Sequence, residues 1–453
     1  MTTVAAELAR LVTTTAEGTL PTLALERAKM SLASTVASAA AGIAIPSARA
    51  IRELALARGP APQASVWFSR QEKLDVAGAA QVNAVSSDAA ACDDSDLRSI
   101  AHIGTIVSSV SIALAEHLGR GGREVLEAMV LGYEVAGRID EALTPGRMKR
   151  GFHGSVSTIF GGAVAAGRLL GLDQARLAHA IALTASSACG MAIAADTSCA
   201  REYHAGLAAQ LGMQAAFAAQ RGFTAETAVL EAPRGFFQAM NGQAVEEVTR
   251  DWGASWDITT DMAIKLMPGA HPFHAIAEAA IEAASAGDVD PRQVDEIVIS
   301  AIQMRDWGAA RNPHDLVSAA HSVIYFVAAG VAERRFEWEH MTERKFTDPL
   351  IAALQERVVF DPAPPPLPDR FPHRHGGTVS IRMRSGQVFT HTCKAPRGSG
   401  ARGVEWADVD AKYRSLVPRS GLAASRVEAS LELIHGLERR ASVSDLTSLI
   451  AAV

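Results

Sequence analysis

Closely spaced small residues constrain the fold of this chain more than any other feature of its sequence. From Val76 to about Met262 the pattern is mainly helical, and alanine is abundant in almost every stretch. Glycines near positions 118–122, 169–173 and 220–223 follow apolar runs, as they do where a helix ends with glycine in the left-handed conformation. Because small side chains let helices approach closely, we predict a large, tightly packed helical domain.

Local signals indicate further helices of this domain. Residues 4–45 predict two helices, with Pro21 near a helix start, where its missing N–H is harmless. Asp173 has the residue type and the position of an N-cap for a helix over Gln174–Cys189. Residues 405–453 are again helical in pattern, so we expect them to return to the same domain.

The pattern changes after Lys265. A helix is predicted over Phe273–Ala284, a strand over Val294–Ile302 from its alternating pattern, and a second helix over Ala319–Glu333. A proline-rich connector at 360–370 cannot be regular helix.

Residues 377–394 read as a hairpin that turns at Ser385-Gly386. The predicted fold class is therefore mainly α, with a large helical domain and a smaller α+β lid domain inserted into it. We place the helical domain at residues 1–262 plus 405–453 and the lid domain at residues 263–404.

Composition excludes several functional classes. The net charge is −6, and no Lys/Arg run stands out, so no nucleic-acid partner is expected. The four cysteines form no C-x-x-C pair, which disfavours a zinc or iron–sulfur site and suits a reducing cytoplasm. The first residues lack the pattern of a secretory signal, and the most apolar stretch, Ser31–Pro46, is too short to span a membrane. We predict a cytoplasmic protein.

Seven segments carry a combined motif, in this order along the chain: CDDSDLRSIAH (92–102), ALAEHLGRGGREVLEAMVLGYEVAGRI (113–139), GFHGSVSTIFGGAVAAGRLLGLD (151–173), REYHAGLAAQLGMQAA (201–216), LEAPRGFF (230–237), KLMPGAHPFHAIAEAA (265–280) and SAAHSVIYFVAAG (318–330). Together they resemble the MmgE/PrpD family. Its members include 2-methylcitrate dehydratases, cis-aconitate decarboxylases and iminodisuccinate epimerases. The resemblance implies a helical domain with a smaller lid domain, a homodimer, a small di- or tricarboxylate substrate, and no cofactor or metal.

His153 lies just before a Gly/Ala-rich helix. The N-terminus of a helix offers free N–H groups and a positive dipole to an anion. A histidine there can act as a base while the helix end holds a carboxylate; the alternative is a loop histidine that caps the helix. The resemblance implies that His153 is catalytic.

His102 follows a cluster of acids, which can orient an imidazole or supply a protonated carboxyl group. The alternative is a solvated acidic loop that contains an N-capping aspartate. In the family this stretch commonly reads Asp-x-Asp-Asp-Thr followed by a histidine. Here Asp93, Asp94 and Ser95 fit the last three positions, Cys92 precedes them, and the spacing to His102 is one residue longer. The resemblance implies catalytic roles for His102 and Asp93 and substrate contacts for Asp94 and Ser95.

Two cations match positions that bind substrate in the family. Arg201 stands where the family usually has lysine, and arginine cannot readily lose a proton. It is therefore expected to hold a substrate carboxylate, unless it pairs with Glu202 or Asp196. Lys265 matches a family lysine that faces the substrate at the domain junction, and we count it among the catalytic residues.

The lid domain contributes three further candidates. Some family members carry a catalytic histidine five residues after the lysine, where this chain has Ala270, with His271 next to it. His274 matches a frequent family histidine, for which substrate binding and a structural role both remain open. Tyr325 matches a family tyrosine that reaches the site, and a buried tyrosine with a satisfied hydroxyl is the alternative. His321 is one turn away in the predicted helix, so both side chains are expected to face the cleft.

These residues support one leading hypothesis and three alternatives. The leading hypothesis is a lyase that dehydrates a 2-methylcitrate-like hydroxy polycarboxylate. His153 or His102 would take the proton, while Arg201 and Lys265 hold carboxylates. The alternatives are an epimerase of the iminodisuccinate type, a decarboxylase of the cis-aconitate type, and a non-catalytic binding protein that kept the fold.

Overall fold

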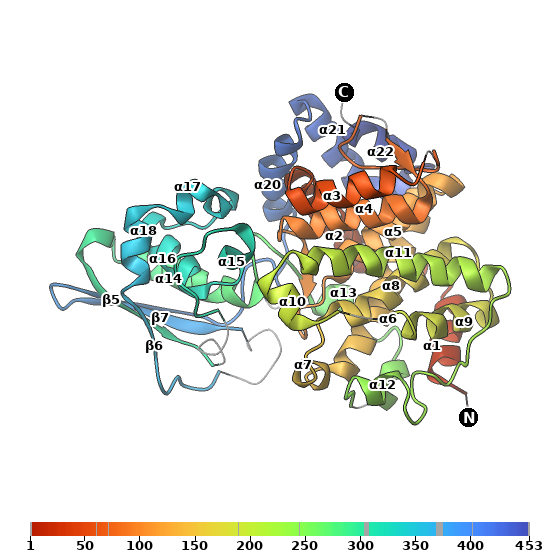
Figure 1. The fold of residues 1–453 in the computed structure, drawn as a ribbon, viewed down its shortest axis with the longest axis horizontal. Helices are drawn as coiled ribbons and strands as arrows, with labels where there is room; N and C mark the ends of the chain where they lie inside the picture. The colour runs from red at the N-terminus through yellow and green to blue at the C-terminus, as the bar shows by residue number, and fades with distance from the viewer. Residues whose placement is uncertain are drawn as a thin grey trace. The chain divides into compact units, whose positions relative to one another are not determined.

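The chain divides into two compact units (Figure 1). Unit 1 comprises Met1–Ile264 and Trp406–Val453, and unit 2 comprises Lys265–Glu405. Within the described residues unit 1 is almost entirely helical and unit 2 combines helices with a four-stranded sheet, so the mainly α fold class is confirmed. The computed structural model describes residues 2–59, 61–70, 72–188, 190–243, 245–302, 308–367, 375–400 and 402–451.

Unit 1 is built around a group of buried helices. α8 packs against α5, α6 and α11, and α4 packs against α2, α5 and α11. The last helices of the chain return to the first ones, since α20 packs against α2 (Figure 1). The helices of this unit are α1 (Val4–Thr14), α2 (Thr22–Gly42), α3 (Pro46–Leu56), α4 (Val76–Ala89), α5 (Ile103–Leu118), α6 (Gly122–Leu143), α7 (Gly146–Lys149), α8 (Ser155–Leu169), α9 (Gln174–Ala185), α10 (Ala192–Thr197), α11 (Ala200–Gln220), α12 (Phe236–Ala239), α13 (Asp257–Thr260), α20 (Trp406–Leu416), α21 (Ala424–His435) and α22 (Ser444–Ile450).

Four short strands complete unit 1. β1 pairs with β2 and β3 pairs with β4, both antiparallel. The second pair joins the acidic segment after α4 to the residues that end the first part of the unit, just before Lys265. The strands are β1 (Ala64–Ser65), β2 (Lys73–Leu74), β3 (Asp94–Asp96) and β4 (Met262–Ile264).

The predicted helix ends of unit 1 are confirmed where they depend on glycine. Gly119, Gly171 and Gly222 have φ of 68°, 66° and 88°, which places them in the left-handed region that suits glycine. Asp173 caps α9 by accepting a hydrogen bond from the backbone N–H of Arg176 at 2.8 Å. This helix ends at Ala185, earlier than predicted, and the predicted last residue lies outside the described residues.

Unit 2 packs helices on a sheet of order β6-β5-β7-β8. β5 and β6 are parallel and the other pairs are antiparallel, so the predicted hairpin is confirmed as β7 and β8. α14 packs against β7, β8 and α16. The elements are α14 (His274–Ala286), β5 (Val294–Ser300), α15 (Leu316–Ala320), α16 (Val323–Glu333), α17 (Glu343–Phe346), α18 (Pro349–Gln355), β6 (Val358–Phe360), β7 (Gly377–Met383) and β8 (Val388–Cys393). The predicted proline-rich connector follows β6 and is described as far as residue 367.

The single helix predicted over Ala319–Glu333 is wrong. α15 ends before His321, and α16 begins after Ser322. The hydroxyl oxygen of Ser322 accepts a hydrogen bond from the backbone N–H of Tyr325 at 3.1 Å. A serine that caps a new helix in this way ends the old one. His321 and Tyr325 are therefore not one turn apart on a common helix face.

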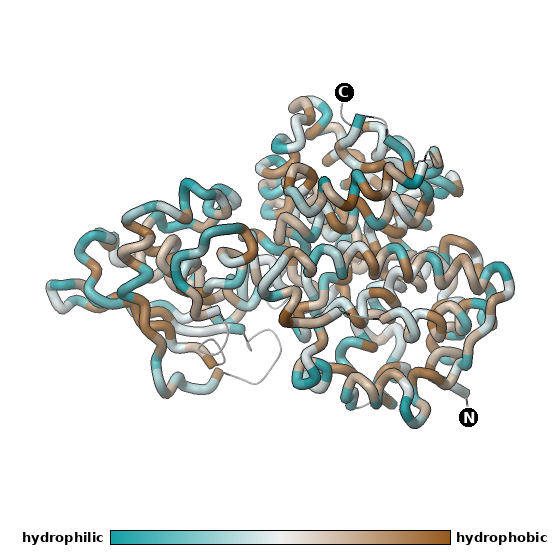
Figure 2. Tube along the Cα trace, viewed as in Figure 1, coloured by the Kyte–Doolittle hydropathy of each residue, from teal (hydrophilic) through white to brown (hydrophobic). Residues whose placement is uncertain are grey.

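Hydrophobic and hydrophilic stretches alternate along the chain in both units, and hydrophilic residues occupy many of the outer turns (Figure 2). In the described part of the chain, no single helix has the length and hydropathy needed to cross a membrane. α2 and α3 pass that test only together, as a pair bent by 93°.

The contact between α2 and α4 depends on a glycine, and this yields the first prediction. A Cβ at Gly42 would lie 1.8 Å from the backbone oxygen of Ser86, so Gly42→Ala forces the two helices apart. We expect the free energy of unfolding in urea to fall by about 2 kcal/mol.

Gly162→Ala is the matched control in α8. Its Cβ would first meet a side-chain methyl of Ile106 at 3.2 Å, and alanine favours a helix by about 1 kcal/mol over glycine. Equal losses of stability in the two variants would contradict the role given to Gly42.

Candidate active site

His102 lies between two buried carboxylates of unit 1. Its Nδ1 is 2.6 Å from Asp88 Oδ1 and 2.8 Å from Asp93 Oδ2. Asp93 Oδ2 also accepts a hydrogen bond from the hydroxyl of Thr105 at 2.8 Å. Because an ionised carboxylate can only accept, these distances place a proton on Nδ1 of His102 and favour the charged ring.

Arg201, in the first turn of α11, contacts Asp88. Its Nε donates to Asp88 Oδ2 at 3.0 Å, and its Nη2 donates to the backbone oxygen of Asp88 at 2.7 Å. Glu202 Oε2 is 3.7 Å from the same Nη2. The pairing with Glu202 that the sequence left open is therefore present, but Asp88 is the nearer partner.

Sequence reasoning missed Asp88. It is the one charged residue in α4, a helix of otherwise small, apolar or uncharged residues whose positions are all buried. A carboxylate in such a helix needs a partner elsewhere in the fold, and that need is the signal that would have found it.

The resemblance implies a site without a metal ion, yet three of these groups are of the types that bind metals. One ligand atom each from Asp88, Asp93 and His102 lies within 4.8 Å of the others, which is the spacing of a possible metal-ion site. Arg201 supplies positive charge to Asp88, and the contacts of His102 have hydrogen-bond length. The absence of a metal, which the resemblance implies, stays a prediction.

His153 lies in the loop between α7 and α8, near His102. Its ring centroid is 6.3 Å from that of His102 and 6.1 Å from that of His204. The backbone N–H of Ser155, in the first turn of α8, donates to His153 Nδ1 at 3.3 Å. Burial holds the pKa of His153 well below its usual range, and the positive charges of His102 and Arg147 act in the same direction. The ring is therefore neutral near pH 7, with Nδ1 as acceptor and Nε2 as donor.

A small cavity lies beside His204. It measures about 10 Å³, room for one water, and its lining includes Ser155, Ser187 and His204. Nδ1 of His204 is buried without a hydrogen-bond partner, and burial lowers the pKa of this histidine. Water in this cavity would satisfy His204.

Asp94 and Ser95 lie in β3 and are buried. Asp94 Oδ2 accepts a hydrogen bond from the hydroxyl of Ser31 at 2.7 Å. Burial raises the pKa of Asp94 to about 6, and the charge of Asp93 adds to the shift. The substrate contacts expected of Asp94 and Ser95 stay predictions.

Lys412 supports the acidic segment from the C-terminal part of the chain. This buried residue of α20 donates to the hydroxyl of Ser34 at 2.6 Å and to the backbone oxygen of Cys92. Sequence reasoning missed Lys412, because its neighbours in sequence give no sign of a site more than 300 residues away along the chain. Its charge also opposes the rise in the pKa of Asp94.

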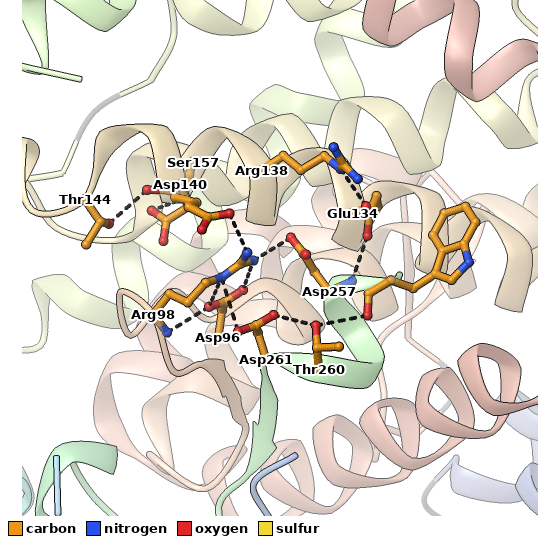
Figure 3. Close-up of polar contacts among 12 residues, drawn as sticks. Asp96, Arg98, Glu134, Arg138, Asp140, Thr144, Ser157, Asp257, Thr260 and Asp261 are labelled. Carbon is orange, nitrogen blue, oxygen red and sulfur yellow. Dashed lines mark hydrogen bonds and ion pairs between the residues drawn. The ribbon is translucent and has the colours of Figure 1, made fainter. Parts of the chain in front are cut away.

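A second buried charge cluster lies at the other end of β3 (Figure 3). Arg98 contacts Asp96 at 2.6 Å, Asp257 at 2.5 Å and Glu141 at 2.9 Å. Asp261 is 3.7 Å away. The cluster fixes the segment that leads from β3 to His102.

Arg147 holds the other histidine segment. Its Nη2 donates to the backbone oxygen of Ser99 at 2.8 Å, and its Nη1 donates to that of Phe152 at 3.1 Å. Its Nε pairs with Asp140 at 3.2 Å. One buried guanidinium thus joins the segment before His102 to the residue that precedes His153.

The remaining predicted residues belong to unit 2. Lys265 is buried and follows Ile264, which pairs with Asp94 in the β3–β4 ladder. His271 and His274 are buried with ring centroids 4.6 Å apart. Tyr325 lies in the core of this unit, and its hydroxyl donates to the backbone oxygen of His340 at 2.6 Å. Catalytic or substrate-binding roles for these four residues stay predictions.

Comparison with known proteins decides the family. The MmgE/PrpD N-terminal domain matches residues 6–248, and the MmgE/PrpD C-terminal domain matches residues 267–438. The chain belongs to the MmgE/PrpD family. The resemblance inferred from the seven segments is therefore confirmed.

Two curated relatives cover most of the chain. Cis-aconitate decarboxylase of Aspergillus terreus is 25% identical over 480 residues, which span 99% of this chain and 96% of the relative. Cis-aconitate decarboxylase of Homo sapiens is 24% identical over 397 residues, which span 85% and 82%. Both relatives have the names of lyases.

The cluster around Arg98 predicts how stability depends on pH. Burial raises the pKa of Asp261 to about 7 and that of Glu134 to about 8. The folded chain then holds these protons more tightly than the unfolded chain, so their stabilising effect is complete at low pH and is lost as the pH rises. We expect these two carboxyl groups to lower the free energy of unfolding from about pH 5 to about pH 8, by at most about 1.4 kcal/mol per pH unit for each proton, while the lowered pKa of His153 acts in the opposite direction.

Asp261→Asn removes one of the two titrations and should flatten this decline in urea unfolding curves. The exposed Glu53→Gln is the matched control and should leave the slope as in the wild type. An unchanged slope in Asp261→Asn would contradict the assignment.

Proposed function

We propose that the protein is a cofactor-independent lyase that transfers a proton at a carbon next to a carboxylate of a small polycarboxylic acid. The proposal rests on one observation above all. Nδ1 of His102 is hydrogen-bonded to Asp88 and lies 2.8 Å from the carboxylate of Asp93, while the neighbouring His153 is kept neutral. Neighbouring groups whose protonation is driven in opposite directions are typical of acid–base sites.

His102 is the proton-transfer group in this proposal. With Nδ1–H directed at Asp88 and Asp93, its Nε2 is the atom that exchanges a proton with the substrate. The two carboxylates stabilise the charged ring and therefore suit a histidine that carries the proton before the reaction begins.

His153 acts as a neutral hydrogen-bond donor. Its Nδ1 accepts from the N-terminus of α8, which leaves Nε2–H to donate to negative charge that develops on the substrate carboxylate. A neutral imidazole at a helix N-terminus is a known way to stabilise an enolate-like oxygen.

Decarboxylation is the reaction we favour. The bond to the leaving carboxylate breaks, carbon dioxide departs, and the electron pair passes into the adjoining unsaturated carboxylate as an enolate. His102 Nε2–H then supplies the proton to carbon. The reaction therefore needs a group that carries its proton before the substrate reacts, and the carboxylates that contact His102 favour its protonated form. The names of the two curated relatives point the same way.

Dehydration of a hydroxy polycarboxylate is the second candidate. It needs a neutral base to take a proton from carbon and an acid to protonate the departing hydroxide. Asp94, whose pKa is raised to about 6, holds a proton for part of the time near neutral pH and favours this possibility.

A substrate panel tests the proposal. The purified protein is incubated in deuterium oxide, with a chelator and no added metal, with cis-aconitate, 2-methylcitrate, citrate and iminodisuccinate, and followed by proton NMR. We expect cis-aconitate to lose a carboxylate and to gain one deuterium at carbon. Water loss from 2-methylcitrate would support the dehydratase, and exchange of C–H without other change would indicate an epimerase and contradict the lyase.

Substitution of the histidines tests the roles. His102→Gln and His153→Ala should each lower kcat/KM by about 100-fold or more on whichever compound reacts. His117→Gln, at the exposed end of α5, is the matched control and should keep the wild-type value. Near wild-type turnover in His102→Gln would show that another group transfers the proton.

A further inference from the structure

Asp88 lies where an unpaired carboxylate is unfavourable. It is 1% exposed and belongs to the last turn of α4, where the negative end of the helix dipole repels a carboxylate. Burial adds a desolvation cost that only cationic or hydrogen-bonding partners can offset. The ionised form of an aspartate at such a position therefore depends on its cationic and hydrogen-bonding partners.

Each oxygen of Asp88 has a partner of its own. Oδ1 faces His102 Nδ1 at 2.6 Å, and Oδ2 accepts from Arg201 Nε at 3.0 Å. Arg201 also donates to the backbone oxygen of Asp88, which accepts the backbone N–H of Ala91 as well. The carboxylate cannot rotate without giving up both contacts. Asp88 therefore fixes the imidazole ring of His102, which precedes α5, and the guanidinium plane of Arg201 in α11.

Asp93 does not duplicate this arrangement. Its Oδ2 is 2.8 Å from His102 Nδ1 but also accepts from the hydroxyl of Thr105, so this oxygen divides its charge between two donors.

We propose that Asp88 is a positioning residue that holds His102 with its proton on Nδ1 and locks Arg201 to the same carboxylate. This rests on the proposed proton transfer by His102. Asp88 thereby makes Nε2 of His102 the reactive atom. The main role of Arg201 is to stabilise the charge of Asp88. It can contact a substrate only in the orientation that its pairing with Asp88 allows.

Nitrogen NMR of protein labelled with ¹⁵N in its histidine rings tests the proposal without any substrate. The signals of His102 are assigned from their loss in His102→Gln. At about pH 8 an ordinary neutral histidine exchanges between two tautomers, whereas His102 should show a protonated Nδ1. In Asp88→Asn this signature should be lost or averaged, and it should be kept in Asp75→Asn, which alters the capping acid at the other end of α4.

The outcomes separate this proposal from the proposed function. Unprotonated Nδ1 in the wild type, or wild-type His102 signals in folded Asp88→Asn, overturns the role of Asp88. If Asp88→Asn does not fold, Arg201→Gln replaces it, because releasing Oδ2 should speed exchange of the Nδ1 proton, and unchanged exchange overturns the proposal. If the signals behave as expected while no panel compound reacts, the positioning role stands and the lyase assignment fails.

Where a panel compound does react, kinetics give an independent readout. Asp88→Asn should lower kcat about 10-fold or more with a smaller change in KM, because it misorients a proton donor and leaves substrate contacts in place. Asp88→Glu keeps the charge and should recover part of that loss. A change confined to KM would mean that Asp88 serves binding instead of positioning His102.

Discussion

The burial of carboxylates beside β3 is the constraint on which unit 1 depends. Asp88, Asp93, Asp94 and Asp96 are all buried among helices of small residues, and each loses its hydration on folding. Two compensating cations come from distant parts of the chain, Arg201 from α11 and Lys412 from α20, and a third, Arg98, comes from the segment directly after β3. The fold is therefore specified by pairing charges across the unit as well as by apolar packing.

This pairing gives neighbouring histidines different chemistry. His102 is surrounded by carboxylates, while His153 accepts from a helix N-terminus and lies close to positive charge. Arg147 ties the segments before both histidines to each other, so their spacing is set by the same buried network that supports the fold. A change in that network acts on catalysis through position as well as on stability.

Glycine and alanine make the arrangement geometrically possible. α4 can carry Asp88 toward both α5 and α11 only because the surrounding helices lie close, and Gly104 illustrates how close. A Cβ there would lie 1.9 Å from Asp94 Oδ2 and 2.2 Å from the hydroxyl of Ser31. The small residues that identify the helical domain in the sequence are thus also those that bring its charged groups within hydrogen-bond distance.

The sequence by itself determined the helical class, the glycine-capped helix ends, the β7–β8 hairpin and, through ordered segments, the family. These depend on local periodicity, on backbone conformations open to glycine, and on motifs that survive as strings of residues. It also pointed to His102 and His153, because both stand beside motif residues. The sequence did not predict the helix break between His321 and Tyr325. Whether a serine caps a new helix or lies inside a continuous one depends on the contacts of its hydroxyl in the folded chain. Only the tertiary structure identified Asp88 and Lys412 and assigned Arg201 to Asp88, because the partner of a buried charge is chosen by distance in space and leaves no local pattern in the chain.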